Sequence, residues 1–175
     1  MTYPQANEAA SYYFGYIDLA RSENIVTFLD EQLAETMSFL EGISEEQSKH
    51  SYAPDKWTIR QVLNHVNDGE RIFLGRALWF ARGFTDPLPS FDQEIAVAGA
   101  NADDTPWSQL VDEFRTIRLS TLSFFQNLPA DAWYRTGVAS DNPFTVNALA
   151  YIIGGHVAHH MNVLRERYLS TDSTD

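Results

Sequence analysis

The sequence predicts an all-α protein, a four-helix bundle with a long crossover between its second and third helices. Four long segments repeat apolar residues at three- and four-residue steps, the spacing of one helix face, and none shows the apolar–polar alternation of a strand. A connection of about two dozen residues after the second segment is long enough to cross the bundle, so that the second and third helices run in the same sense. We expect one domain over residues 1–175, with an ordered core at about 16–169.

The N-terminal part of the chain contains the first predicted helix. Residues 1–14 show no helical spacing and are expected to form a weakly ordered lead-in. The helix is predicted over about 22–40, where Ser22 or Asn24 can cap the first turn and Gly42 follows the last one.

The second predicted helix extends over about 58–82. Thr58 is a suitable N-cap and Gly83 a suitable stop. The crossover at 83–106 contains prolines and glycines that exclude one continuous helix, although residues 92–98 are expected to form a helical turn or two.

Two further helices complete the predicted bundle. The third is expected over about 105–128, with Pro106 at its first helical position. The segment 129–144 is predicted to be irregular, and the fourth helix is expected over about 145–169, starting at Thr145.

The charge of the chain bears on its partners. Acidic residues outnumber basic ones 24 to 12, which gives a formal net charge of −12. Nucleic-acid binding requires clustered Lys and Arg, whereas Arg71, Arg76 and Arg82 are spread along one predicted helix and no basic cluster occurs. We therefore expect no nucleic-acid partner, and the acidic surface also argues mildly against a strongly anionic substrate.

Cysteine content and hydropathy bear on the compartment. The chain has no cysteine, which excludes disulfides, thiolate metal ligands and a cysteine nucleophile. No apolar run reaches the roughly 18 residues of a membrane span, and the first residues lack the basic and apolar regions of a signal peptide. A cytoplasmic protein without a membrane partner is expected.

His156 and His160 lie four residues apart in the segment GGHVAHHMNV of the fourth predicted helix. This spacing places two imidazoles on one helix face, about 5–6 Å apart at Cβ, and both positions continue the apolar face. A buried polar ring without a partner costs about 1–3 kcal/mol. The pair fits two interpretations equally well: ligands of one metal ion, or core histidines that hydrogen-bond to tyrosine or carboxylate groups.

His65 supplies a third imidazole from the second predicted helix. Gly69, one turn further on, leaves room beside this ring for an ion or a bound molecule, or else permits close helix packing. Bundles build metal sites from side chains on facing helices, and three neutral imidazoles leave a coordination position open for water or substrate. We therefore predict that His65, His156 and His160 hold one metal ion.

Other polar residues carry weaker predictions. His159 is rotated about 100° from its neighbour along the helix and is expected beside the site or at the surface, not as a ligand. Asp68 could orient a ligand or activate a bound water, although an exposed helix carboxylate is the commoner situation. Glu70 and Arg71 are expected to form salt bridges at the surface or between helices. No glycine-rich phosphate loop, HExxH, GxSxG or Glu-x-x-His motif occurs.

Two segments, PDKWTIRQVLNHVNDGERIF and GGHVAHHMNVLRERYL, resemble the DinB-like superfamily, four-helix proteins first named for DNA-damage induction. The spacing of the first predicted helix resembles this family as well, so the resemblance covers about residues 16–169. It is greatest for the YfiT-like branch of metal-dependent hydrolases and bacillithiol S-transferases.

The resemblance implies a bundle with a long crossover, in which the three metal-binding histidines of the family correspond to His65, His156 and His160. The ion of the family is usually a divalent metal such as zinc or nickel, with water completing its shell. Characterised relatives transfer low-molecular-weight thiols or isomerise substrates with a thiol cofactor, and dimers are common. The resemblance thus implies a small-molecule substrate and a homodimer, and it assigns no catalytic residue.

Three kinds of function remain open from the sequence. A metal-dependent enzyme would use a bound thiol or a bound water as its nucleophile, as a thiol S-transferase or a hydrolase acting on a small molecule. A binding module would hold a metal or a small ligand in a stress response, without turnover. A purely structural bundle would bind nothing. We favour the enzyme, because the three-histidine pattern leaves an open coordination position.

Overall fold

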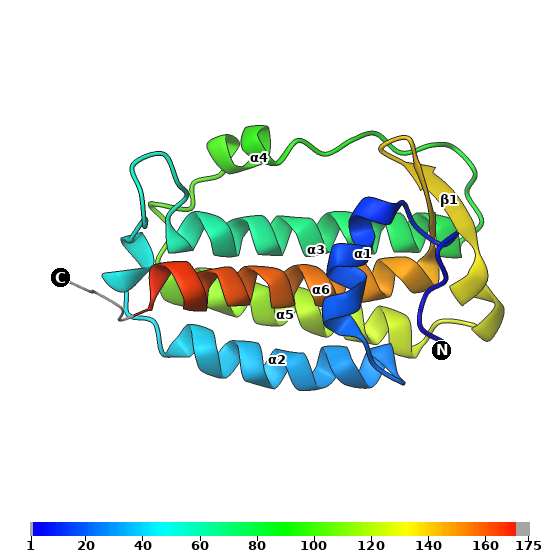
Figure 1. Ribbon diagram of the computed structural model, residues 1–175, viewed down its shortest axis with the longest axis horizontal. Helices are drawn as coiled ribbons and strands as arrows, with labels where there is room; N and C mark the ends of the chain where they lie inside the picture. The colour runs from blue at the N-terminus through cyan, green and yellow to red at the C-terminus, as the bar shows by residue number, and fades with distance from the viewer. Residues whose placement is uncertain (1, 171–175) are drawn as a thin grey trace.

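The computed structural model describes residues 2–170 and contains the predicted bundle (Figure 1). The helices α3 and α5 run in one sense and α2 and α6 in the other, as a long crossover between the second and third bundle helices requires (Figure 1). The all-α fold class is therefore confirmed. The four bundle helices are α2 (Ile25–Glu41), α3 (Ile59–Ala81), α5 (Trp107–Gln126) and α6 (Val146–Val163).

Side-chain caps start three of these helices where the sequence predicts them. The Asn24 side chain accepts hydrogen bonds from two backbone N–H groups in the first turn of α2. Thr58 and Gln61 form a reciprocal capping box at the start of α3, and Thr145 caps α6. Such caps pair backbone donors that have no partner within the helix. The helix α6 begins at Val146 and continues as a π-helix over Leu164–Tyr168, close to the predicted range of about 145–169.

A β-hairpin occupies the segment 129–144 that was predicted to be irregular, so this prediction was wrong. After a 3-10 helix over Ala130–Tyr134, strands β1 (Thr136–Ala139) and β2 (Asn142–Thr145) pair antiparallel. The two turn residues, Ser140 and Asp141, both have positive φ angles, 51° and 59°. Hairpin turns of this kind are usually made by Asn-Gly or Asp-Gly, and the absence of that signal explains the wrong prediction.

The N-terminal segment is also ordered, contrary to the prediction for residues 1–14, of which the structure describes 2–14. Ala9 is buried and forms a β-bridge with Phe144, and the Glu8 carboxylate accepts hydrogen bonds from Thr145 and Asn147. The core therefore extends beyond the expected range of 16–169. Short helices follow this segment: Ser11–Tyr13, α1 (Phe14–Ile17) and Asp18–Ala20.

The crossover lies along α3 and carries the helical turns expected at 92–98, observed as α4 (Gln93–Gly99) (Figure 1). At its start, Leu88 forms a parallel β-bridge with Ala139 of the hairpin. At its end, the Asp103 carboxylate accepts hydrogen bonds from the capping box of α3. Among residues 2–170, no helix is both long enough and apolar enough to cross a membrane.

A buried hydrogen-bond network connects all four bundle helices. The guanidinium of Arg118 on α5 forms a bidentate ion pair with Glu70 on α3, with both N···O distances 2.8 Å. It also donates to the Leu29 carbonyl and the Gln32 side chain on α2, and Gln32 donates in turn to the Gly154 carbonyl on α6 at 2.8 Å. The salt bridge expected for Glu70 thus lies between helices, in the core.

We expect Arg118→Met to destabilise the protein by about 3–5 kcal/mol, because it leaves the Glu70 carboxylate buried without a counter-charge. Urea unfolding measures this change. The double variant Glu70→Leu/Arg118→Met should recover much of the loss. Arg115→Met, which removes two exposed ion pairs, with Glu41 and Asp112, should cost less than about 1 kcal/mol. Equal effects of the Arg118 and Arg115 variants would contradict the assignment.

Candidate metal centre

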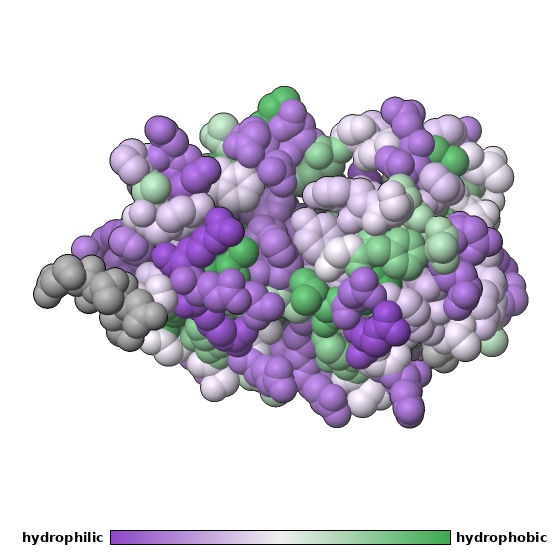
Figure 2. Space-filling model, in the orientation of Figure 1, coloured by the Kyte–Doolittle hydropathy of each residue, from purple (hydrophilic) through white to green (hydrophobic). Residues whose placement is uncertain are grey.

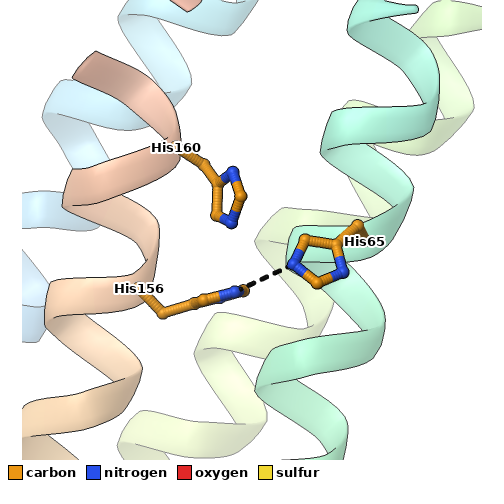
Figure 3. A group of neighbouring side chains, drawn as sticks. All are labelled: His65, His156 and His160. Atoms are coloured by element: carbon orange, nitrogen blue, oxygen red, sulfur yellow. Dashed lines mark hydrogen bonds between the residues drawn. The ribbon is translucent and has the colours of Figure 1, made fainter. Parts of the chain in front are cut away.

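The helices α3 and α6 bring the three predicted histidines together (Figure 3). His65 from α3 faces His156 and His160 from α6, and one ring nitrogen from each lies within 4.8 Å of the others. The Nε2 atoms of His65 and His156 are 3.1 Å apart. Both of these side chains are buried, with exposed fractions of 6% and 4%, and His160 is half-buried. The predicted convergence is therefore present in the fold.

Glycine at position 69 makes room for one of these rings. A Cβ atom there would lie 2.7 Å from Cε1 of His156 and 3.2 Å from its Nδ1. The space beside His65 is thus filled by the His156 side chain of α6. Of the two interpretations of Gly69, the structure therefore favours close packing between helices over room for a bound molecule.

A second glycine seats the N-terminal segment against the site. A Cβ atom at Gly155 would lie 1.8 Å from the carbonyl oxygen of Tyr16, so only glycine allows α1 to approach α6 this closely. This contact places the Tyr16 ring edge-on to the rings of His156 and His159, with both centroid distances 5.5 Å. Tyr16 therefore covers one side of the cluster.

The opposite side of the cluster is covered by aromatic residues from the loop before α3 and the end of α6. The Trp57 ring packs against His65 with a centroid distance of 5.1 Å. The Tyr168 hydroxyl donates a hydrogen bond of 2.8 Å to the Trp57 carbonyl, which holds this segment in place. Burial raises the pKa of Tyr168 to about 12, so this donor keeps its proton.

The hydrogen-bonding state of the rings fits a cation. Two neutral imidazoles that face each other through Nε2 can share only one proton, whereas a cation between them accepts a lone pair from each ring. Nε2 of His65 faces His156 and is the atom that would bind the cation. Its other ring nitrogen, Nδ1, is buried without a hydrogen-bond partner among residues 2–170. The chemistry of the donor set, three imidazole nitrogens, suits zinc, nickel, copper and iron alike.

Burial keeps the three imidazoles neutral. It lowers the pKa of His65 to about 4 and that of His160 to about 3, and it also lowers the pKa of His156 well below the ordinary value. Repulsion between the neighbouring histidines acts in the same direction. Since a metal ligand must be the neutral imidazole, the site is in its ligand form throughout the neutral range.

Two pockets open on either side of the cluster, and a hollow is visible beneath α4 in Figure 2. The first, of about 200 Å³, we call the tyrosine pocket; it is lined by His65 and His156 together with Tyr12, Tyr13, Tyr16 and Arg76. The second, of about 340 Å³, we call the tryptophan pocket; it is lined by His160 together with Trp57, Glu94, His159 and Tyr168. Gln93 at the start of α4 lines both.

Residues near the histidines differ in their relation to the cluster. His159 lies beside it, edge-on to His160 at 4.9 Å, and is not one of the three converging residues. The Asp68 carboxylate accepts hydrogen bonds from Asn64 and Arg71, and among residues 2–170 it has no hydrogen bond to the three histidines. Arg71 pairs with Glu113 across to α5, so its expected salt bridge is also between helices.

Comparison with known proteins identifies the family. The family model of the DinB superfamily matches residues 29–164, which is well over half of the chain. The chain belongs to the DinB superfamily. Among solved structures, YfiT from Bacillus subtilis, described as a probable metal-dependent hydrolase with an unusual four-helix bundle topology, is similar with a TM-score of 0.66 and 18% identity, over 94% of this chain and 92% of that one. No curated protein matches the sequence.

Several residues around the site of this DinB member were not predicted. Tyr16 lies in the segment before the predicted bundle, and Gln93 and Glu94 reach the site only because α4 lies over it. Their positions depend on contacts between distant segments, and helical periodicity carries no such information. The proline- and glycine-rich crossover was nevertheless a usable signal, since long loops in compact domains often serve function.

The lowered histidine pKa values predict how the stability of the metal-free protein depends on pH. The unfolded chain takes up protons near pH 6.5, whereas the folded His65 does so only near pH 4. The contribution of each neutral histidine to the free energy of unfolding is therefore fully present above pH 6.5. It decreases by about 1.4 kcal/mol per pH unit below that value. Urea unfolding between pH 7 and 4 measures this slope.

A His65→Gln/His160→Gln variant provides the control for this measurement, because glutamine does not titrate. Its stability should fall less steeply below pH 6.5 than that of the wild type, since the remaining carboxylates contribute equally to both proteins. Parallel slopes for the two proteins would show that the buried histidines are not the source.

Proposed function

We propose that this protein is a metal-dependent enzyme that binds a divalent cation, zinc or nickel, through His65, His156 and His160 and acts on a small molecule. The observation that carries this proposal is the convergence of three neutral imidazoles, two buried and one half-buried, at the junction of two pockets. Transfer of a low-molecular-weight thiol or hydrolysis is the proposed reaction. The description of YfiT supports hydrolysis, and the family resemblance supports either reaction.

The number of ligands supports an enzyme over a closed storage site. The cluster contains three residues, and no further His, Cys, Asp or Glu joins it among residues 2–170. A cation held by these residues would supply an open position at which a thiol or a water would lose its proton readily. A non-catalytic metal- or ligand-binding bundle, the alternative, would be better served by a fourth protein ligand.

The surrounding residues would shape the reaction. Trp57 and Tyr16 cover the imidazoles on two sides and limit the access of bulk water. Glu94 of α4 lines the same pocket as His160, and its charge acts on His65. We assign to this exposed carboxylate the role of general base, which accepts the proton that the nucleophile releases. The homodimer and the cytoplasmic location expected from the sequence belong to the same proposal.

Metal analysis tests the ligand assignment. The wild-type protein, purified without chelators, is expected to carry about one divalent ion per chain, and His160→Ala should lose most of it because two imidazoles hold the ion far less tightly. Elemental analysis measures the content. The loaded wild type should also add thiols to a generic electrophile, or hydrolyse a generic ester, faster than the metal-free protein.

His159→Ala is the matched control for His160→Ala. It removes a neighbouring imidazole from the same turn of α6 and should leave the metal content unchanged. If His160→Ala retains the full content, the ligand assignment is wrong. Equal rates for the loaded and the metal-free wild type, with metal bound, would favour the non-catalytic alternative.

Gly69→Ala should weaken metal binding without unfolding the protein. The added methyl group would lie 2.7 Å from Cε1 of His156, so the ring has to move away from the other two. We expect the affinity for zinc, measured by competition with a chromogenic chelator, to fall by at least about tenfold, a typical effect of disturbing a ligand's support.

Gly75→Ala provides the comparison on the same helix, because a Cβ atom there meets nothing within 4 Å. This variant should gain up to about 1 kcal/mol of stability from helix propensity and bind zinc normally. Unchanged zinc affinity in Gly69→Ala would mean that the position of the His156 ring is not decisive.

A further inference from the structure

The tyrosine pocket contains a buried cation that has no counter-charge. Three arginines are almost fully buried: Arg60, Arg76 and Arg118, with exposed fractions of 2%, 5% and 0%. Arg60 is paired with Glu45, and Arg118 with Glu70. Among residues 2–170, no carboxylate forms a salt bridge with Arg76. Of these three buried arginines, Arg76 is therefore the one without an ion pair in the described part of the chain.

The hydrogen bonds of Arg76 leave much of its guanidinium free. Its Nη2 donates to the Pro89 carbonyl at 3.3 Å and to the Ser140 hydroxyl at 2.9 Å. Within residues 2–170, Nε and Nη1 donate no hydrogen bond to a carbonyl or a carboxylate, and the Tyr13 side chain lies beside the guanidinium as a polar neighbour. Burial lowers the pKa of Arg76. A buried cation without a counter-charge is costly, whereas a bound anion would compensate the charge.

Arg76 and the metal centre belong to one cavity. His65, Gly69, Phe73 and Arg76 lie on one face of α3 and all line the tyrosine pocket. Eleven residues separate His65 from Arg76, about 16 Å along the helix axis at 1.5 Å per residue, and the arginine side chain leans back toward the helix N-terminus. A small extended molecule can therefore reach both the imidazoles and the guanidinium.

The residue that supports the guanidinium adopts a costly backbone conformation. Ser140 has a φ of 51° in the hairpin turn, which a residue other than glycine adopts at a cost of about 1–3 kcal/mol. This turn places the Ser140 hydroxyl at the rim of the pocket, where it accepts from Arg76 and leaves the other nitrogens available. Strain held at a pocket is consistent with a binding role.

We propose that Arg76 binds an oxyanion, a carboxylate or a phosphate, at the far end of a substrate whose reacting end lies at the three histidines. This inference rests on the proposed function and adds the substrate class. It also revises the expectation that the acidic chain disfavours anionic substrates. Exposed charges are screened beyond about 8 Å in physiological salt, whereas the buried guanidinium contacts the oxyanion directly.

Matched ligands that differ only in the terminal group test this proposal. Cobalt-loaded wild-type protein is titrated with 6-mercaptohexanoate, 6-mercaptohexyl phosphate and 6-mercaptohexanol, and thiolate binding is followed by the cobalt absorbance. The acids should bind at least about tenfold more tightly than the alcohol, as expected for a charge-assisted contact. The tighter of the two acids identifies the oxyanion.

Variants of Arg76 and of Arg82, the residue that follows α3, show whether the preference arises at Arg76. Arg76→Gln should reduce the preference for the acids to less than about threefold, and Arg76→Lys should retain part of it because the charge remains. Arg82→Gln removes an exposed arginine at the end of the same helix and should behave as the wild type. Equal binding of acid and alcohol, or a preference that survives Arg76→Gln, would overturn the proposal.

A measurement without metal separates this proposal from the proposed function. In metal-free, ¹⁵N-labelled protein, the Arg76 Nε–H signal, assigned by its absence from Arg76→Lys, should shift on addition of hexanoate and not of hexanol. If the wild type binds no cobalt, the proposed function is wrong, and this titration alone decides the role of Arg76. A signal that stays unmoved by hexanoate would overturn it.

Discussion

The buried ion pair between Arg118 and Glu70 is the constraint on which the arrangement of the bundle depends. A bidentate pair permits little sliding of α5 along α3, and Gln32 extends the same network to the backbone of Gly154 on α6. Glu70 follows the α3 histidine by five residues, and Gly154 precedes the first α6 histidine by two. The polar network therefore sets the axial register of the two helices that carry the imidazoles.

The polar network sets the axial register of the helices, and glycines set how closely the helices approach one another. Gly69 lets an imidazole of α6 enter the surface of α3, and Gly155 lets the backbone of α1 lie directly on α6. The consequence is a buried site assembled from polar rings, with aromatic covers on both sides. Because α6 is buried at every position from Val146 to Val157, it serves both as the central core helix and as the source of two of the three rings.

The sequence predicted the features that depend on local periodicity, and it could not predict those that depend on contacts between distant segments. Helix positions follow from apolar spacing, and the convergence of the histidines followed from their places on two apolar faces. The hairpin was missed because Ser140 and Asp141 are unusual turn residues. Arg76 lies on the same helix as the exposed Arg82, and only the hairpin and the crossover packed above it distinguish a buried arginine from an exposed one.

The separation of His65 and His156 by 91 positions along the chain has a consequence for biosynthesis. The helix α6 is synthesised after the other three bundle helices, and a nascent chain that lacks it has neither the centre of the core nor two of the three imidazoles. A cation could therefore not organise the early stages of folding in the way that it does in small zinc-dependent modules. Binding of the cation would instead follow the synthesis and docking of α6, so that the ion enters a bundle that has already formed.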